Sequence, residues 1–233
     1  DLVGQVEPGT FSLIEMATYC PGANVPYTAE LVGAVVSRDL VSFGDAQLRL
    51  RVEFFTSGWY KQGNYLGGWD GAVAGFVAAA GRPYGPNATV SASVPGGAQY
   101  ESNFKIQNYN GNWWIAHNGN WLGYYPGSMF DLIRWKGCQA QWYGEVYDPT
   151  PTNWTWTDMG TGYQASVGFR WAAHVRNPFY ASPAGVSYWP DSPIAMGPSD
   201  AHCYTESSFR IGAAPWDRSF YLGGPGGNGP GCD

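Results

Sequence analysis

The chain has 233 residues, of which 17% are aromatic and only 13% are charged. This composition excludes a disordered protein, and because all-β sandwiches commonly reach this length as one unit, we expect a single domain over residues 1–233. The formal net charge of −6, with only 12 lysines and arginines, disfavours nucleic-acid and anionic-membrane partners, which require basic patches.

The apolar pattern along the chain is short and has a period of two, which is typical of half-buried strands. In residues 48–54, leucine, valine and phenylalanine alternate with arginine and glutamate, and residues 104–107 alternate in the same way. Turn sequences at 95–97, 110–111, 118–119 and 126–127 combine proline or asparagine with glycine and separate such runs. The sequence therefore predicts an all-β fold with many strands.

One segment, residues 128–135, has a helical pattern instead. Ser128 is suited to cap its start, and Met129, Leu132 and Ile133 fall on one face. We predict a helix of about two turns there. No apolar run reaches about 18 residues, so we expect no transmembrane helix, and the chain reads as a mature secreted form whose leader has been removed.

Motifs exclude several kinds of catalytic site. The histidines form no H-E-x-x-H arrangement and no G-x-S-x-G elbow is present, although the members of a Ser-His-Asp triad can lie far apart in a sequence. The four cysteines contain no C-x-x-C pair, so we expect two disulfides rather than a metal or redox site. We expect no metal and no cofactor, and carboxylates remain as the candidates for catalysis.

Glu145 lies in a strand whose alternation predicts a polar and aromatic wall, typical of a substrate groove. Strand geometry places five residues on one face: Gln139, Gln141, Tyr143, Glu145 and Tyr147. Glu53 has a different setting, because it alternates with Arg49 and Arg51, and we expect it on an ion-paired, solvated strand face.

Glu30 is the single charged residue in an otherwise apolar strand over residues 27–36. A carboxylate in such a strand is either buried with hydrogen-bonding partners or functional. Both interpretations stay open at this point, and Glu30 joins Glu145 as a candidate catalytic residue.

Short motifs in a shared order relate this chain to a known family. They lie at 28–30 (Thr-Ala-Glu), 74–77 (Ala-Gly-Phe-Val), 111–115 (Gly-Asn-Trp-Trp-Ile), 122–126 (Leu-Gly-Tyr-Tyr-Pro), 142–146 (Trp-Tyr-Gly-Glu-Val), 158–162 (Asp-Met-Gly-Thr-Gly) and 221–226 (Tyr-Leu-Gly-Gly-Pro-Gly). In this order they resemble the motifs of the neprosin family, secreted glutamic peptidases that cut next to proline. One departure follows Glu30, where Leu31-Val32-Gly33 stands in place of the family's A-G-W.

The resemblance implies a fold and a site. The fold would be an antiparallel β-sandwich of jelly-roll type with a concave substrate groove, and Glu30 and Glu145 would be the two catalytic glutamates. The resemblance also implies a disulfide between Cys203 and Cys232, which leaves Cys20 to pair with Cys138.

The resemblance further implies a substrate and a chemistry. Proline-containing peptides and proteins would be the partners of a monomeric, secreted enzyme. One carboxylate would activate water at acidic pH while the other keeps its proton, because two neighbouring carboxylates do not readily both ionise. We expect Glu145 to be the base. Five aromatic residues are candidates for groove walls, with sandwich core as the alternative: Trp59, Trp113, Trp114, Tyr143 and Tyr147.

Two other functions fit the same features. A jelly-roll glycoside hydrolase also uses paired carboxylates in an aromatic groove. A carbohydrate-binding module is favoured by exposed tryptophan and tyrosine, but not by a lone glutamate in an apolar strand. Peptides and polysaccharides assayed side by side distinguish these alternatives.

Overall fold

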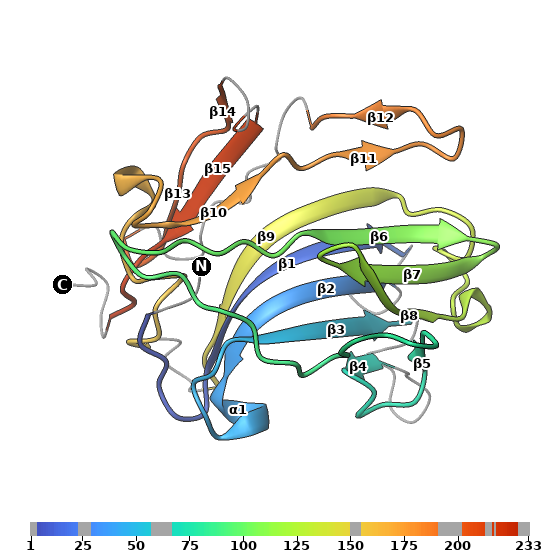
Figure 1. The fold of residues 1–233 in the computed structure, drawn as a ribbon, viewed down its shortest axis with the longest axis horizontal. Coiled ribbons are helices and arrows are strands. Elements are labelled where there is room, and N and C mark those ends of the chain that lie inside the picture. The colour runs from blue at the N-terminus through green and yellow to red at the C-terminus, as the bar shows by residue number, and fades with distance from the viewer. Residues whose placement is uncertain are drawn as a thin grey trace.

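The computed structural model describes residues 4–22, 29–56, 67–149, 155–190, 202–212, 216 and 218–227. Strands dominate this part of the chain, and their pairings are antiparallel. The predicted all-β class is confirmed. Figure 1 shows the strands gathered into layers, with the short helix α1 (Leu40–Phe43) at one edge.

The largest sheet, called the arched sheet below, has five strands in the order β4-β3-β2-β1-β9. Their bounds are Gly67–Trp69 (β4), Arg49–Phe55 (β3), Glu30–Asp39 (β2), Phe11–Cys20 (β1) and Gln139–Tyr147 (β9). Helix α1 joins β2 to β3, and it begins where the carboxylate of Asp39 accepts a hydrogen bond of 2.8 Å from the backbone N–H of Ser42. The long central strands β1 and β2 thus lie side by side, with β9 closing one edge.

A second sheet, called the outer sheet below, has the order β5-β8-β7-β6. Its strands are Val77–Ala78 (β5), Asn120–Tyr125 (β8), Asn112–His117 (β7) and Phe104–Tyr109 (β6). Two tight hairpins join β6 to β7 and β7 to β8, at Asn110-Gly111 with φ of 51° and 74° and at Asn118-Gly119 with φ of 47° and 79°. Asparagine and glycine tolerate this left-handed backbone, so the predicted turns are confirmed at both places.

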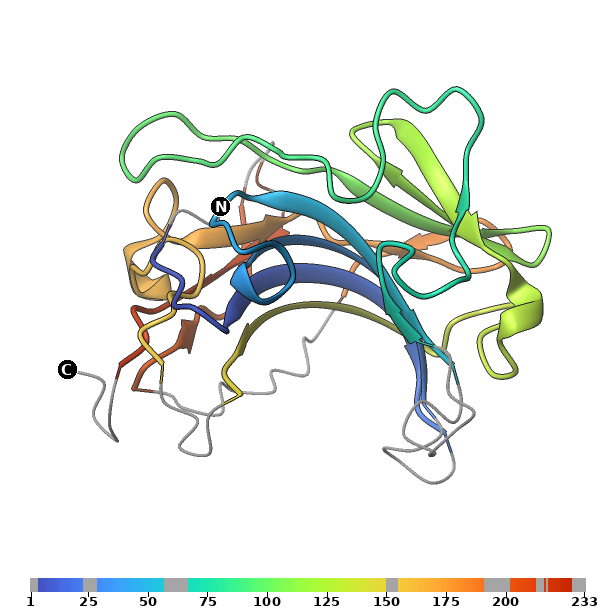
Figure 2. The same ribbon diagram turned by 90° about the horizontal axis from the view of Figure 1, so that it is seen from below.

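The main hydrophobic core lies between the arched sheet and the outer sheet. Alternate residues of β2 and β3 meet the inward side chains of β7 and β8, and the cluster includes Val32, Ala34, Leu50, Val52, Phe54, Trp113, Ile115, Leu122 and Tyr125. Figure 2 shows the large sheet as an arch with the outer sheet on its convex side. Because successive strand residues point to opposite faces, the remaining side chains of β1, β2, β3 and β9 point to the concave side.

The rest of the described chain forms smaller units. Strands β10 (Ala173–Arg176), β15 (Arg218–Gly223), β13 (Thr205–Glu206) and β14 (Arg210–Ile211) form one sheet, and β11 (Tyr180–Ala181) pairs with β12 (Ser187–Tyr188). Two short 3-10 helices occur at Gly127–Met129 (η1) and Ala165–Val167 (η2).

The predicted helix over residues 128–135 is wrong beyond its first turn. Only η1 is helical there, and Phe130 after it is extended, with φ −116° and ψ 145°. The backbone N–H groups of residues 131–133 donate to the carboxylate of Glu30 at 2.8 to 3.0 Å. A buried side-chain acceptor therefore takes the donors that a helix would have used internally.

A disulfide joins Cys20, at the end of β1, to Cys138, just before β9, as predicted. Cys203 is also disulfide-bonded, and its predicted partner Cys232 lies outside the described residues. None of the helices in the described part of the chain is long and apolar enough to cross a membrane.

Candidate active site

Three glutamates lie on the concave side of the arched sheet. Leu13 of β1 is opposite Glu145 of β9, and Glu15, two residues further along β1, shares the face of Leu13. On β2, Gly33 is opposite Glu53 of β3, and it also shares this face. We call Glu15, Glu53 and Glu145, together with Tyr143 opposite Glu15, the carboxyl cluster.

Glu15 and Glu53 come from strands that β2 separates, and they meet above a glycine. A Cβ atom placed on Gly33 would lie 2.0 Å from Oε1 of Glu15 and 2.9 Å from Cγ of Glu53. The two side chains thus occupy the space that any side chain at position 33 would need. Glu15 is buried, with 2% of its surface exposed, and Glu53 is half-buried.

Burial keeps this pair protonated. The pKa of Glu15 is raised well above its ordinary value by burial and then by the charge of Glu53, and burial raises the pKa of Glu53 to about 7. Among the described residues, no N–H or hydroxyl group donates to Oε1 of Glu15, and the group that faces this atom is the carboxyl of Glu53. A hydrogen bond between two carboxyls requires a proton on one of them, so the pair titrates as a unit with Glu15 as the more strongly protonated member.

Tyr143 holds the other oxygen of Glu15. Its hydroxyl donates a hydrogen bond of 2.5 Å to Oε2 of Glu15. Burial, and then the neighbouring negative charges, raise the pKa of the Tyr143 hydroxyl, so the phenol keeps its proton and remains a donor. The carboxyl of Glu15 is therefore oriented from both sides, by Tyr143 and by Glu53.

Glu145 is the exposed member of the cluster. Its pKa is raised by partial desolvation, and its charge raises the pKa values of Glu15, Glu53 and Tyr143. Because water stabilises its charged form better than those of its neighbours, we infer that Glu145 ionises first as the pH rises.

A nearby arginine does not neutralise the cluster. Arg51 shares the concave face with Glu53, but its guanidinium is buried in ion pairs with Asp39 and, at 2.6 Å, with Asp70. It lowers the pKa of Glu53 only as a minor influence. Two aspartates thus hold this cation, and Glu53 is not on the solvated, ion-paired face that the sequence predicted.

Glu30 lies on the opposite face of the arched sheet from Glu145. On β1, Cys20 is opposite Glu30 and Leu13 is opposite Glu145. Seven residues separate Cys20 from Leu13, and because this number is odd, the two glutamates point to opposite faces of the sheet. They stand about 23 Å apart along the strand direction. Glu30 is fully buried against the core, and its two oxygens accept the three backbone hydrogen bonds from residues 131–133. The structure therefore does not bring the predicted catalytic pair together, and Glu30 follows the other interpretation, a buried carboxylate with partners.

The predicted substrate-binding residues fall into separate places. Gln141 and Tyr147 lie on the concave face of β9, where the ring of Tyr147 stacks on that of Phe11 with centroids 4.9 Å apart. Trp114 lies on the exposed face of the outer sheet, packed on Tyr124. Trp113, the other aromatic candidate of that strand, is in the core, and Trp59 lies outside the described residues.

Glu15 and Glu53 were missed by the sequence interpretation. Glu15 had a usable signal, since it is the only charged residue in the apolar run from Phe11 to Cys20, by the same criterion that selected Glu30. For Glu53, alternation with arginines pointed to the surface, because a sequence does not reveal that Arg51 is engaged elsewhere.

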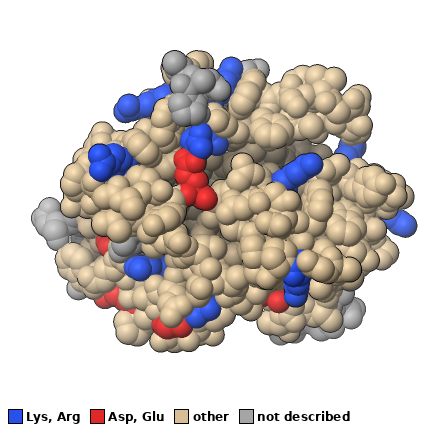
Figure 3. Space-filling model, viewed as in Figure 1, with Lys and Arg blue, Asp and Glu red and all other residues tan. Residues whose placement is uncertain are grey.

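Charged groups are dispersed over the face of the molecule that carries the outer sheet (Figure 3). The face seen in Figure 3, on the side of the outer sheet, is largely uncharged, with basic and acidic groups scattered over it. No group of three or more histidine, cysteine, aspartate or glutamate side chains within the described ranges is arranged to hold a metal ion. The chemistry that this cluster can perform is proton transfer between carboxyls, water and a bound molecule.

A comparison with protein families gives one match. The model of the family described as neprosin matches residues 10–225 of the 233 in the chain. The matched range contains every member of the carboxyl cluster, and membership of this family supports a peptidase.

Proposed function

Because this chain belongs to the neprosin family, we propose that it is a secreted endopeptidase that hydrolyses peptide bonds next to proline. The observation that supports this proposal best is the placement of three carboxyl groups with raised pKa values on one face of the arched sheet, where two of them meet above Gly33. Glutamic peptidase chemistry requires an ionised and a protonated carboxyl beside the scissile bond, and the cluster offers both.

Glu145 serves as the general base. In its ionised form it takes a proton from a water molecule, whose oxygen attacks the carbonyl carbon of the scissile bond. Its exposure and its position at the edge of the cluster suit it to meet water and substrate. The negative charge that develops moves to the carbonyl oxygen, where it needs a donor.

The Glu15 and Glu53 pair supplies that donor in place of Glu30. A proton held by the pair is donated in a hydrogen bond to the carbonyl oxygen as the tetrahedral intermediate forms. When the C–N bond breaks, the leaving nitrogen takes a proton from the pair, and the other product is a carboxylic acid. The proton that Glu145 took from water then returns to the pair through solvent, which restores the starting state. Glu53 is the member of the pair that reaches solvent, so it delivers the proton while Glu15, held by Tyr143, supports it.

The concave face of β9 suits an extended peptide. Tyr147 is 41% exposed and offers an aromatic surface at one side of Glu145, and Gln141 offers amide donors and acceptors at the other. Proline-containing segments lose little entropy on binding and pack well on aromatic rings. The disulfide between Cys20 and Cys138 is compatible with an oxidising, extracellular environment.

The test is an analysis of products. A proline-rich protein is digested over a range of pH, and the new termini are identified by mass spectrometry, with and without a chelator. The proposal predicts termini that cluster at proline, formed equally well with chelator present. Termini unrelated to proline would contradict the proposed preference for bonds next to proline. Release of reducing sugar from polysaccharides, without any peptide cleavage, would favour a glycoside hydrolase.

A further inference from the structure

The exposed face of the outer sheet is separated from the carboxyl cluster by the main core. Two adjoining hollows open on this face. The first, of about 260 Å³, is lined by Asn103, Lys105, Ala116, Gly119 and Trp121. The second, of about 330 Å³, is lined by Gln107, Tyr109, Trp114 and Trp121. Trp121 is the wall that the two hollows share.

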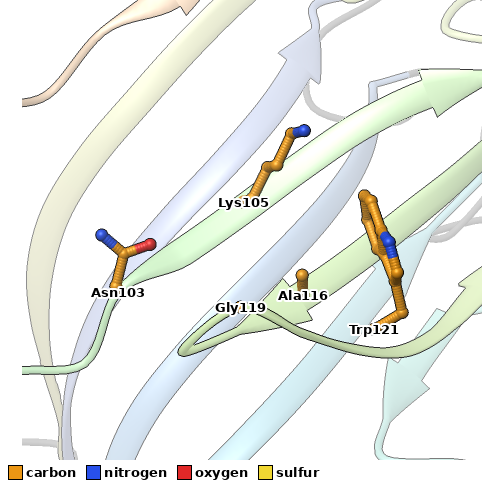
Figure 4. Close-up of a pocket in the computed structure, with 5 residues that line it drawn as sticks. All are labelled: Asn103, Lys105, Ala116, Gly119 and Trp121. Atoms are coloured by element: carbon orange, nitrogen blue, oxygen red, sulfur yellow. The ribbon is translucent and has the colours of Figure 1, made fainter.

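Strand register explains the shape of the first hollow. Ala116 of β7 is opposite Lys105 of β6 on one side and Trp121 of β8 on the other. Figure 4 shows the two long side chains standing on either side of the small one. The ammonium group of Lys105 lies 5.3 Å from the centre of the Trp121 ring, a favourable cation–π contact that holds the two in place.

Aromatic contacts also fix the tryptophans of this face. Trp114 packs edge-on to Trp121, with ring centroids 5.8 Å apart, and lies against Tyr124 at 4.6 Å. Trp121 is nevertheless 38% exposed and Tyr109 is 60% exposed. Ordered aromatic surface of this extent is costly to leave in water, and it marks a binding surface.

The polar groups around the rings indicate the chemistry of the ligand. Asn103 is exposed and Gln107 is half-buried, so their side-chain amides are accessible from the hollows, and Lys105 adds a cation. Among the described residues, no carboxylate lines either hollow. Amides both donate and accept, so they match hydroxyl groups, which also do both. A proline-rich peptide offers mainly carbonyl acceptors and would use only the donors.

We propose that this face binds a neutral oligosaccharide or polysaccharide chain. The apolar faces of successive sugar rings lie on Trp121, Trp114 and Tyr109, while Asn103, Lys105 and Gln107 contact the hydroxyl groups. The lining residues run from Asn103, just before β6, to Tyr109 at its end, which spans about 20 Å of extended chain, so the site accepts several sugar units in a row. The protein thus attaches to a glycan-rich matrix by one sheet, and this attachment is independent of the carboxyl cluster on the other.

Affinity electrophoresis tests this proposal. The intact protein is run through native gels that contain soluble neutral polysaccharides, namely hydroxyethyl cellulose, xyloglucan and galactomannan. We expect retardation by at least one of them, with affinity reduced about tenfold or more in Trp121→Ala. Ala116→Leu fills the first hollow while keeping Trp121, and we expect it to weaken binding too. Trp156→Ala removes an exposed tryptophan elsewhere, with 42% exposure in the native chain, and should leave retardation unchanged.

Other outcomes would overturn the proposal. These are migration of the native protein unaffected by all three polysaccharides, or retardation that persists in both Trp121→Ala and Ala116→Leu. Binding of a proline-rich peptide is measured separately by calorimetric titration. Peptide binding that depends on Trp121, in a protein that binds no polysaccharide, would assign the face to peptides instead. Cleavage of a short peptide by Trp121→Ala should match the native rate, so failure here is separable from failure of the proposed peptidase.

Discussion

The carboxyl groups of Glu15 and Glu53 meet across an intervening strand, in the space above Gly33. Carboxyls this close repel one another when both are ionised, and here burial and repulsion together favour the protonated forms of the pair.

Replacing either acid of the pair should reduce catalysis strongly. Glu53→Gln removes the proton donor to the leaving nitrogen, and Glu15→Gln removes the group that positions it. We expect kcat to fall by about 10²–10⁴-fold for Glu53→Gln and by a smaller factor for Glu15→Gln. Steady-state cleavage of a proline-containing peptide, with circular dichroism to verify folding, measures both. Rates within a factor of about two of native in Glu53→Gln would exclude it from the chemistry.

Space above Gly33 is required for the pair to meet. In Gly33→Ala the new methyl group would overlap Oε1 of Glu15, at 2.0 Å, so the carboxyls must separate. We expect a loss of activity of at least about tenfold and a decrease in unfolding free energy of about 1–3 kcal/mol. Gly212→Ala is the control, since its nearest neighbour would lie at 3.5 Å. Equal activity in the two variants would contradict the arrangement described.

Stability should decrease as the pH rises. The folded state raises the pKa of Glu53 from 4.5 to about 7, so between these values the folded protein binds more protons than the unfolded chain. The contribution of protonated Glu53 to the stability of the folded state is therefore fully present below about pH 4.5 and is lost as the pH passes through about 7. Chemical denaturation measures the free energy of unfolding at pH 5 and at pH 8. Between these pH values we expect it to fall by about 2 kcal/mol less in Glu53→Gln than in the native protein. An identical pH dependence in native protein and variant would contradict the raised pKa.

The rate should depend on pH in a bell-shaped manner. The ascending limb reports ionisation of Glu145, and the descending limb follows loss of the proton from Glu53 near pH 7. The optimum therefore lies on the acid side of neutrality. In Glu53→Gln the residual activity should lose the descending limb, as measured by kcat/KM between pH 3 and pH 9. An optimum well above pH 8 in the native protein would be incompatible with a protonated pair.

The strand pattern and the tight turns were predictable, because alternation and Asn-Gly pairs act locally. The disulfide between Cys20 and Cys138 was predictable only through the family resemblance, which implied a bond between Cys203 and Cys232 and left these two cysteines. The pairing of the strands was not predictable from the sequence. Glu30 and Glu15 have similar local sequences, each a lone acid in an apolar strand, and only the register reveals that they point to opposite faces. Burial of Glu30 also explains the missing helix after Met129, since its carboxylate takes the backbone donors. Long-range partners therefore decide both where the helix ends and on which face of the sheet Glu30 lies.

In the proposed mechanism Glu145 is the general base and Glu30 takes no part in the chemistry, so kcat/KM for cleavage of one proline-containing peptide should be compared in Glu145→Gln and Glu30→Gln. We expect Glu145→Gln to remain fully stable and to lose about 10²–10⁴-fold in kcat/KM. Glu30→Gln should lose about 3 kcal/mol of stability, because an amide replaces a carboxylate that accepts three backbone hydrogen bonds, and its folded fraction should retain near-native turnover. A stable Glu30→Gln without activity, beside an active Glu145→Gln, would contradict the account.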